Sequence, residues 1–160
     1  MDQKSILFVC LGNICRSSMA EGSFRQVAAD SGLDQLLHIE SAGTGSWHIG
    51  NPPDERAQQA SLARGRDISG QRAQQVTPRL LEQCDLILAM DESNLSEIRN
   101  LMEISDHHKS RLFLEFSPEP GVVEVPDPYY GSAEGFEHVL DLIDLASAGL
   151  LDYCRTALGK

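Results

Sequence analysis

The sequence lacks paired cysteine spacings, long apolar runs and a secretory leader pattern. Its four cysteines, Cys10, Cys15, Cys84 and Cys154, fit neither a secreted disulfide framework nor a CxxC or His-containing zinc pattern. No apolar run is long enough to cross a bilayer, and MDQKSILFVC at the N-terminus has no charged, apolar and small-residue regions in the order of a signal peptide. These absences predict a cytoplasmic protein without a metal site.

Basic residues are also scarce. Lys and Arg number 13 against 24 Asp and Glu, so the formal net charge is −11. A surface of this sign repels nucleic acid and anionic lipid, and we expect neither nucleic acid nor membrane as a partner. An anion could bind only at a local site that overcomes the field of the whole molecule.

Length and composition are those of an ordinary globular protein. The chain has 160 residues, of which 41% are hydrophobic and 23% are charged, and it contains no repeat, low-complexity tract or long linker. We therefore expect a single domain over residues 1–160.

Short apolar runs alternate with helix-like patterns along the chain. The expected buried strands are Ser5–Val9, Leu36–Gly43, Asp85–Met90 and Ser110–Phe116. The expected helices begin near Ser17, Asp54, Pro78 and Asp91, and a last helix with an apolar stripe from Phe136 to Cys154 follows a loop over residues 117–132. This alternation predicts a parallel sheet with helices on both faces and a ligand site at the carboxyl ends of the strands.

The start and end of the first helix carry local signals. Ser17 or Ser18 can cap it, Glu21 stands near the capping-box position, and Gly32 can end it.

The stretch CLGNICRS, Cys10 to Ser17, connects the first expected strand to this helix. Backbone N–H groups of such a turn can converge on an anion, and the start of the helix adds further N–H groups and the positive end of its dipole. Arg16 adds a planar fork that matches two phosphate oxygens. Gly12 permits a positive φ and Asn13 tolerates one, so the loop can close tightly. The stretch predicts an oxyanion site.

Cys10 lies at the mouth of this loop. A thiolate there would be stabilised by the same donors as the oxyanion, and the hydroxyl of Ser17 could donate another hydrogen bond. The pattern predicts a sulfur nucleophile beneath a bound phosphorus. The alternative, a buried small hydrophobe at Cys10 and a surface cation at Arg16, does not explain why a strand, a glycine and a helix surround them in this order.

CLGNICRS resembles the phosphate loop of the low-molecular-weight protein tyrosine phosphatases. Three further motifs follow in the family's order: SAGT before Trp47, AMDESN over 89–94 and DPYYG over 127–131. The resemblance spans nearly the whole chain. It implies a flavodoxin-like three-layer sandwich with a four-stranded parallel sheet of order 2-1-3-4.

The resemblance also implies an activity: hydrolysis of phosphotyrosine and small aryl phosphates through a phosphocysteine intermediate, without metal or other cofactor. The implied partner is a phosphotyrosine-containing protein, and we expect a monomer or weak dimer. An arsenate reductase-like thiol redox enzyme is the alternative, although Cys84 and Cys154 are poorly placed for a cysteine relay. A noncatalytic phosphate-binding module would not need both Cys10 and Asp127.

The resemblance assigns roles residue by residue. Cys10 is the nucleophile, Arg16 holds the phosphoryl oxygens, and Asp127 is the general acid and then the base. Asn13 holds the loop in its strained shape with support from Ser41. The substrate-binding residues are Leu11, Gly12, Asn13, Ile14, Cys15, Ser17, Trp47, Tyr129 and Tyr130.

Simpler interpretations stand beside several of these roles. Asp127 precedes a proline and by itself is typical of a turn. Tyr129 and Tyr130 could be half-buried aromatics, whereas the glycine-rich loop around Trp47 favours a surface position. Asp91 and Asn94 are interpreted as helix capping.

Cys15 is either a buried loop thiol or a redox partner whose disulfide with Cys10 shelters the nucleophile. Cys84 and Cys154 fall on apolar stretches and are expected in the core. Two residues depart from the family pattern: Ser18 replaces a proline, and Gln71 replaces a histidine that supports Asn13 in some relatives.

Overall fold

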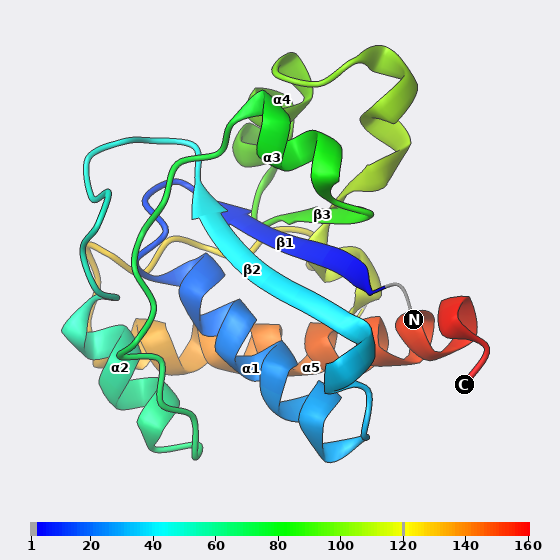
Figure 1. Cartoon of the computed structure of the whole chain (residues 1–160). Coiled ribbons are helices and arrows are strands. Elements are labelled where there is room, and N and C mark those ends of the chain that lie inside the picture. Colours follow the sequence, from blue (N-terminus) through cyan, green and yellow to red (C-terminus); the bar gives the residue numbers. More distant parts are fainter. Residues whose placement is uncertain (1–2, 120) are drawn as a thin grey trace.

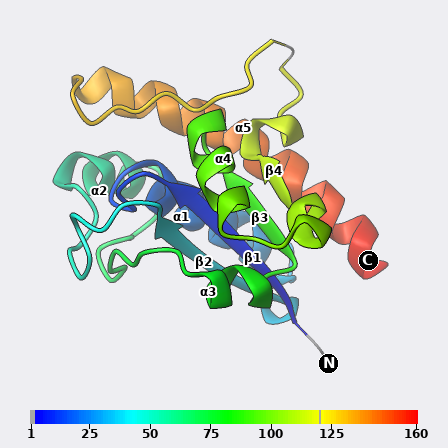
Figure 2. The same ribbon diagram turned by 90° about the horizontal axis from the view of Figure 1, so that it is seen from above.

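The computed structural model of the chain describes residues 3–119 and 121–160, and a parallel sheet lies between two layers of helices (Figures 1 and 2). The strands are β1 Lys4–Cys10, β2 Leu37–Gly43, β3 Leu86–Ala89 and β4 Ser110–Leu112. Their order is β2-β1-β3-β4 and every pairing is parallel, which confirms the predicted topology. Residues 1, 2 and 120, which fall within the predicted domain and the predicted loop over 117–132, lie outside the described residues.

The helices match the expected positions closely. They are α1 Arg16–Asp30, α2 Glu55–Leu62, α3 Pro78–Gln83, α4 Glu92–Asn100 and α5 Ala133–Leu158, with short 3₁₀ helices at Asp34–Leu36, Ile104–Lys109 and Phe113–Phe116. Helices α1, α2 and α5 lie on one side of the sheet and α3 and α4 on the other (Figure 1). None of the helices within the described ranges has the length and apolar character needed to cross a membrane.

The central strand β1 contributes to the core on both faces of the sheet. Ile6 and Phe8 belong to the apolar cluster shared with α1 and α5, whereas Leu7 and Val9 belong to the cluster shared with α3 and α4. Successive side chains of a strand point to opposite faces, so a strand covered on both sides must be apolar throughout. The uninterrupted apolar run therefore places β1 in the middle, and its carboxyl end becomes the centre of the site.

Capping residues set several helix boundaries as predicted. Asp54 Oδ1 accepts a hydrogen bond from the N–H of Arg56 at 2.8 Å, and Asp91 Oδ1 accepts one from the N–H of Asn94 at 2.7 Å. Gly32, with φ of 73°, ends α1 as expected.

The predicted cap of α1 is wrong. Cys15 occupies the N-cap position without a side-chain cap, because the hydroxyl of Ser17 bonds to Cys10 and that of Ser18 donates to the carbonyl of Cys15. The carboxylate of Glu21 accepts a hydrogen bond from Ser41 rather than closing a capping box. The first turn of α1 therefore keeps N–H groups that no side chain caps, as an anion site at a helix N-terminus requires.

The fourth strand is shorter than predicted. It ends at Leu112, and Phe113–Phe116 forms a 3₁₀ helix instead of continuing the ladder. The carboxylate of Glu115 accepts a hydrogen bond from the N–H of Leu112 at 2.9 Å, which satisfies a donor at the point where the strand stops. Phe113 and Leu114 are both buried, so their apolar pattern resembles that of a strand.

Candidate active site

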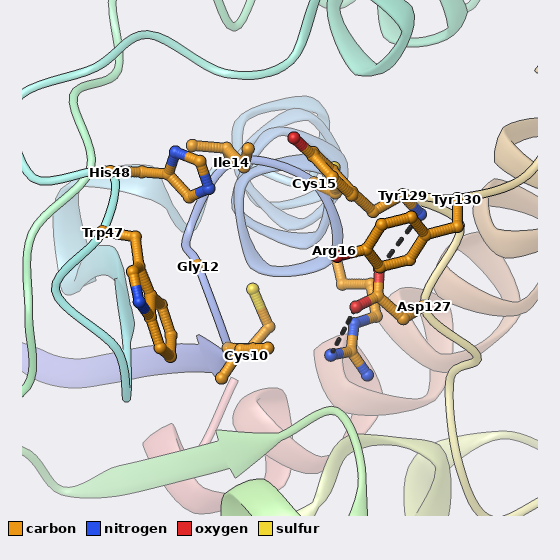
Figure 3. A pocket seen from close by; sticks show the side chains of 11 residues that line it. Cys10, Gly12, Ile14, Cys15, Arg16, Trp47, His48, Asp127, Tyr129 and Tyr130 are labelled. Atoms are coloured by element: carbon orange, nitrogen blue, oxygen red, sulfur yellow. Dashed lines mark hydrogen bonds and ion pairs between the residues drawn. The ribbon is translucent and has the colours of Figure 1, made fainter.

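A cavity of about 390 Å³ opens beside the carboxyl end of β1. Its lining brings together three segments that are far apart in the sequence: the loop after β1, the loop after β2 and the segment before α5 (Figure 3). The lining residues are Cys10, Leu11, Gly12, Ile14, Cys15, Arg16, Trp47, His48, Asp127, Tyr129 and Tyr130. Every lining residue except His48 is predicted from the sequence, whereas the predicted Asn13 and Ser17 lie buried beside the cavity rather than in its wall.

Cys10 is the last residue of β1 and is 2% exposed. Its sulfur lies 3.0 Å from Oγ of Ser17 and accepts a hydrogen bond from the backbone N–H of Asn13 at 3.3 Å. These contacts orient the sulfur: the N–H of Asn13 donates to it, and in the contact with Ser17 either the thiol or the hydroxyl can be the donor.

Asn13 is the non-glycine residue with a positive φ, 58°, in the described part of the chain. Its amide nitrogen donates to Oγ of Ser17 at 2.8 Å and to Oγ of Ser41 at 2.9 Å, and its amide oxygen accepts the backbone N–H of Gln74 at 3.0 Å. Ser41 in turn donates to Glu21 at 2.7 Å. This network stabilises a left-handed conformation that L-residues otherwise avoid.

Gln71 does not take part in this network. Its amide nitrogen donates to the carbonyl of Ser18 at 3.1 Å, and its amide oxygen is buried without a hydrogen-bond partner in the described part of the chain. The support for Asn13 comes instead from Ser41 and from the main chain of Gln74. The family resemblance places Gln71 where some relatives have a histidine that supports Asn13. In this chain the amide of Gln71 bonds to the carbonyl of Ser18 and not to Asn13.

The glycines near the loop act through space rather than through positive φ. Gly12 does not have a positive φ. A Cβ at this position would lie 3.0 Å from Cδ2 of His48. A Cβ at Gly43, the end of β2, would lie 2.7 Å from the carbonyl oxygen of Leu11. The expected role of Gly12 is therefore corrected: both glycines let neighbouring segments approach the phosphate loop.

Arg16 is 3% exposed and holds a fixed position. Nη1 donates to Oδ2 of Asp91 at 2.7 Å and to the carbonyl of Val125 at 3.0 Å, while Nη2 lies 3.7 Å from Oδ2 of Asp127. Burial alone would lower the pKa of Arg16, but the negative groups at Cys10, Asp91 and Asp127 outweigh it and raise that pKa. The guanidinium therefore stays charged in a buried position.

Asp91 has a second function beyond the capping role predicted for it. Its Oδ1 caps α4 and its Oδ2 pairs with Arg16. The position of Asp91 in the sequence could have indicated this contact with Arg16, because Asp91 follows the carboxyl end of β3 at the same sheet edge as the phosphate loop. Asn94 is buried and only its backbone N–H meets Asp91, in agreement with a structural role.

Asp127 approaches the cavity from the segment before α5 (Figure 3). Its side chain is 38% exposed, and Oδ1 accepts a hydrogen bond from the N–H of Tyr129 at 3.1 Å. Upstream, the N–H of Val125 donates to the carbonyl of Met90 at 2.8 Å. The carboxyl group is thus fixed beside Arg16 but remains accessible from the cavity.

Aromatic side chains surround the mouth of the cavity. Trp47 is 71% exposed, which confirms its predicted surface position, and Tyr130 is 94% exposed. The rings of Tyr129 and Tyr130 meet edge to face at 4.9 Å, and the ring of His48 lies 6.3 Å from that of Tyr129. His48 was missed, although it follows Trp47 directly in the loop after β2.

Cys15 is buried and carries a free thiol, as does Cys10. Burial, followed by the carboxylate of Asp54, raises the pKa of Cys15 far above that of an ordinary thiol, so its sulfur is neutral. Whether the two sulfurs form a disulfide under oxidation stays a prediction. Cys84 and Cys154 are buried as predicted, and burial raises the pKa of each to about 11.

No group of three or more His, Cys, Asp or Glu side chains arranged to hold a metal ion occurs within residues 3–119 and 121–160.

Comparisons with known proteins give a consistent result. The family model described as low molecular weight phosphotyrosine protein phosphatase matches residues 5–160. A low-molecular-weight protein-tyrosine-phosphatase of Bacillus subtilis, YfkJ, is 42% identical over 147 residues, which cover 92% of this chain and 93% of that protein. A putative member from Synechocystis is 43% identical over 159 residues and covers 97% of this chain and 96% of its own length.

Solved structures agree with the sequence relatives. The crystal structure of YfkJ superposes with a TM-score of 0.92 at 39% identity and covers 98% of each chain. A protein tyrosine phosphatase of Entamoeba histolytica, crystallised with Hepes in its active site, also has a TM-score of 0.92, at 32% identity over 98% of this chain and 99% of that one.

Proposed function

The chain belongs to the low-molecular-weight phosphotyrosine protein phosphatase family, and from that premise we propose which of its residues perform the hydrolysis. The protein is a protein-tyrosine phosphatase, a cysteine-based hydrolase of phosphoric monoesters that acts on phosphoproteins. The relatives' names support this function over an arsenate reductase. The convergence of Cys10, Arg16 and Asp127 on one cavity is the observation that carries the proposed assignment.

In the first step, the sulfur of Cys10 attacks phosphorus. The S–P bond forms while the bond from phosphorus to the tyrosyl oxygen breaks, and Asp127 gives its proton to that oxygen. Arg16 and the N–H groups of the phosphate loop bind the three equatorial oxygens, whose charge is redistributed in the transition state. The location of Arg16 Nη2, 3.7 Å from Oδ2 of Asp127, supports this arrangement because both groups reach the same cavity.

In the second step, water attacks phosphorus and Asp127, now a carboxylate, takes its proton. The S–P bond breaks, inorganic phosphate forms, and the electron pair returns to the sulfur of Cys10. The hydroxyl of Ser17 stabilises this leaving thiolate, a role supported by its distance of 3.0 Å from the sulfur. Asn13, with Ser41 behind it, keeps the loop in the conformation that both steps require.

Binding combines a polar floor with apolar walls. Main-chain groups of Gly12, Ile14 and Cys15 belong to the floor, where backbone N–H groups contact the phosphate. The phenyl ring of the substrate lies between the walls formed by Leu11, Trp47, Tyr129 and Tyr130. Because the nucleophile is nearly buried at the bottom, the depth of the cavity favours an aryl phosphate that projects from the protein surface.

The cellular setting is proposed on chemical grounds. A catalytic thiol works best in reducing surroundings, which favours the cytoplasm. The substrates we propose are phosphotyrosine-containing proteins, and the net charge of −11 opposes nucleic acid and anionic membranes. We further propose that residues 1–160 act as a single phosphatase domain, as a monomer or weak dimer.

The direct test is hydrolysis of an aryl phosphate by purified protein treated with a chelator. We expect turnover to persist without metal and to be inhibited by vanadate, while Cys10→Ser abolishes it with the fold intact by circular dichroism. Turnover in Cys10→Ser equal to wild type would reject the mechanism. Consumption of arsenate with a thiol reductant, measured in parallel, tests the alternative.

A further inference from the structure

Arg56, in the first turn of α2, reaches the segment that carries Asp127. Nη1 donates to the carbonyl of Gly131 at 3.1 Å and Nη2 donates to the carbonyl of Tyr129 at 2.8 Å. The donor and the two acceptors are separated by more than 70 positions in the chain, so this contact exists only in the folded protein. Arg56 belongs to none of the sequence motifs that identify the site.

The guanidinium of Arg56 is held from several directions. Nε donates to Oδ1 of Asp54 and Nη2 to Oδ2 of the same carboxylate, each at 3.0 Å. The guanidinium carbon also lies 4.7 Å from the ring centre of Phe136 and 5.6 Å from that of Tyr129. A forked ion pair together with ring contacts fixes the orientation of a guanidinium better than a single contact does.

The opposite end of this connection is the phosphate loop. The backbone N–H of Asp54 donates to the carbonyl of Ile14 at 2.8 Å, and Asp54 is also the N-cap of α2. A continuous series of contacts therefore runs from Ile14 through Asp54 and Arg56 to Tyr129. It joins the loop that binds phosphate to the segment that supplies the proton.

Pro128 is buried, but few other hydrogen bonds hold the segment from Asp127 to Gly131. In the described part of the chain, its other hydrogen bonds are local: the N–H of Tyr129 donates to Asp127, and that of Gly131 donates to the carbonyl of Pro128. The ion pair between Arg16 and Asp127 is long, at 3.7 Å. Arg56 therefore supplies the hydrogen bonds that fix the main chain of this segment to another element.

We infer that Arg56 is a positioning residue for the general acid: it holds the carbonyls of Tyr129 and Gly131, and thereby places Asp127 over the leaving oxygen. This inference rests on the proposed role of Asp127 as the acid. Arg56 acts through the main chain and not on the substrate. Its loss affects the proton transfer that Asp127 performs and leaves phosphate binding in the loop intact.

The test uses aryl phosphates whose leaving groups differ in their need for a proton. Phenyl phosphate needs protonation of its leaving oxygen, whereas 2,4-dinitrophenyl phosphate leaves readily as an anion. For Arg56→Ala we expect kcat/KM to fall roughly 10-fold with phenyl phosphate and less than about 2-fold with the dinitrophenyl ester. Inhibition by inorganic phosphate should be unchanged, and Arg56→Lys should recover part of the loss.

Two further variants separate positioning from general destabilisation. Arg64→Ala removes another arginine that binds carboxylates on α5, namely those of Glu137, Asp141 and Asp144, but no part of the acid segment. We expect it to lower the melting temperature without the dependence on leaving group. In an Asp127→Asn background, Arg56→Ala should cause no further loss with phenyl phosphate, because the group that it positions is already inactive.

The inference is overturned by equal losses with both esters in Arg56→Ala, or by an additive loss in the double variant. If Arg56→Ala does not fold, Arg56→Lys repeats the comparison with a smaller loss, since an ammonium cannot hold both carbonyls in a fork. The proposed role of Asp127 as the acid is tested separately. Asp127→Asn must itself lose more activity with phenyl phosphate than with the dinitrophenyl ester, and equal losses there reject both the acid and its positioning residue.

Discussion

Nη1 of Arg16 lies 2.7 Å from Oδ2 of Asp91, while Oδ1 of Asp91 accepts the N–H of Asn94 at 2.7 Å. One carboxylate therefore begins α4 and orients the guanidinium that faces the cavity. An adequate helix cap needs only a polar oxygen, but a buried guanidinium also needs a negative partner. The two functions can be separated by substitution.

Asp91→Asn keeps a good cap and removes the negative charge beside Arg16. We expect kcat/KM for phenyl phosphate to fall about 10-fold, because the charge-assisted hydrogen bond that orients the guanidinium is lost: when the amide oxygen caps α4, the amide nitrogen faces Nη1 of Arg16, and both are donors. Asp91→Asn should also lower the free energy of unfolding, because the buried guanidinium of Arg16 loses its negative partner, and Asp91→Ala should lose about a further 1 kcal/mol with the cap. Steady-state kinetics and denaturant unfolding measure both effects. Wild-type kinetics in Asp91→Asn would show that Val125 alone orients Arg16.

The left-handed backbone of Asn13 gives a second pair of variants. Asn13→Gly removes the amide but accepts a φ of 58° without strain, whereas Asn13→Ala loses the amide and also strains the backbone. We expect both to reduce kcat/KM, and the alanine variant to be less stable than the glycine variant by about 1 kcal/mol. Urea unfolding measures this difference. Equal stability of the two would mean that the loop relaxes to another conformation.

The two cysteines of the phosphate loop should differ in reactivity. Both cysteines line the cavity, but burial and Asp54 raise the pKa of Cys15, so its thiol is protonated at neutral pH, whereas the sulfur of Cys10 contacts Ser17 and the N–H of Asn13. We expect iodoacetate at neutral pH to label Cys10 first, with protection by inorganic phosphate. Peptide mapping reads out the site, and labelling of Cys15 at the same rate would contradict this prediction.

Asp144 should make stability depend on pH in the acid range. Burial would raise its pKa, but the ion pair with Arg66 and the hydrogen bonds from Ser23 and Arg64 outweigh burial and lower it. Because the pKa of Asp144 is lower in the folded state, the stabilisation is present above the pKa of the unfolded state, about 3.9. It is lost as the pH falls through the pKa of the folded state. Asp144→Asn should therefore be less stable than wild type by about 1 to 2 kcal/mol at pH 7.

The difference between Asp144→Asn and wild type should shrink as the pH falls below about 4. Denaturant unfolding at both pH values measures it, and Asp152→Asn, a change at an exposed position on the same helix, is the control. A difference that stays constant across this range would mean that the carboxylate of Asp144 contributes nothing through its charge.

Local patterns predicted most of the fold. The buried strands β1 and β3 follow from short continuous apolar runs, and the stripe on α5 follows from apolar residues at helical spacing. The caps at Asp54 and Asp91 follow from side chains that bond within one turn. The predicted fourth strand was too long, because a buried 3₁₀ helix and a short buried strand both have runs of apolar residues. Periodicity alone cannot separate them.

The site was predicted where its residues lie in one loop or in a recognisable motif. The cap of α1 was wrong because Ser17 and Glu21 use their polar atoms in contacts with residues that the sequence does not place nearby, Cys10 and Ser41. The connection from Arg56 to Tyr129 was missed for the same reason. Such contacts depend on how remote elements pack, and no local spacing encodes them.

In the proposed mechanism, the sulfur of Cys10 carries the phosphoryl group between the two steps. This intermediate can be detected by rapid mixing of the protein with a phosphotyrosine peptide bearing radiolabelled phosphate, quenching within one turnover and peptide mapping. We expect label on the peptide that contains Cys10 and no label in Cys10→Ser. Phosphate release by the wild-type protein with no label on Cys10 at any time would contradict it.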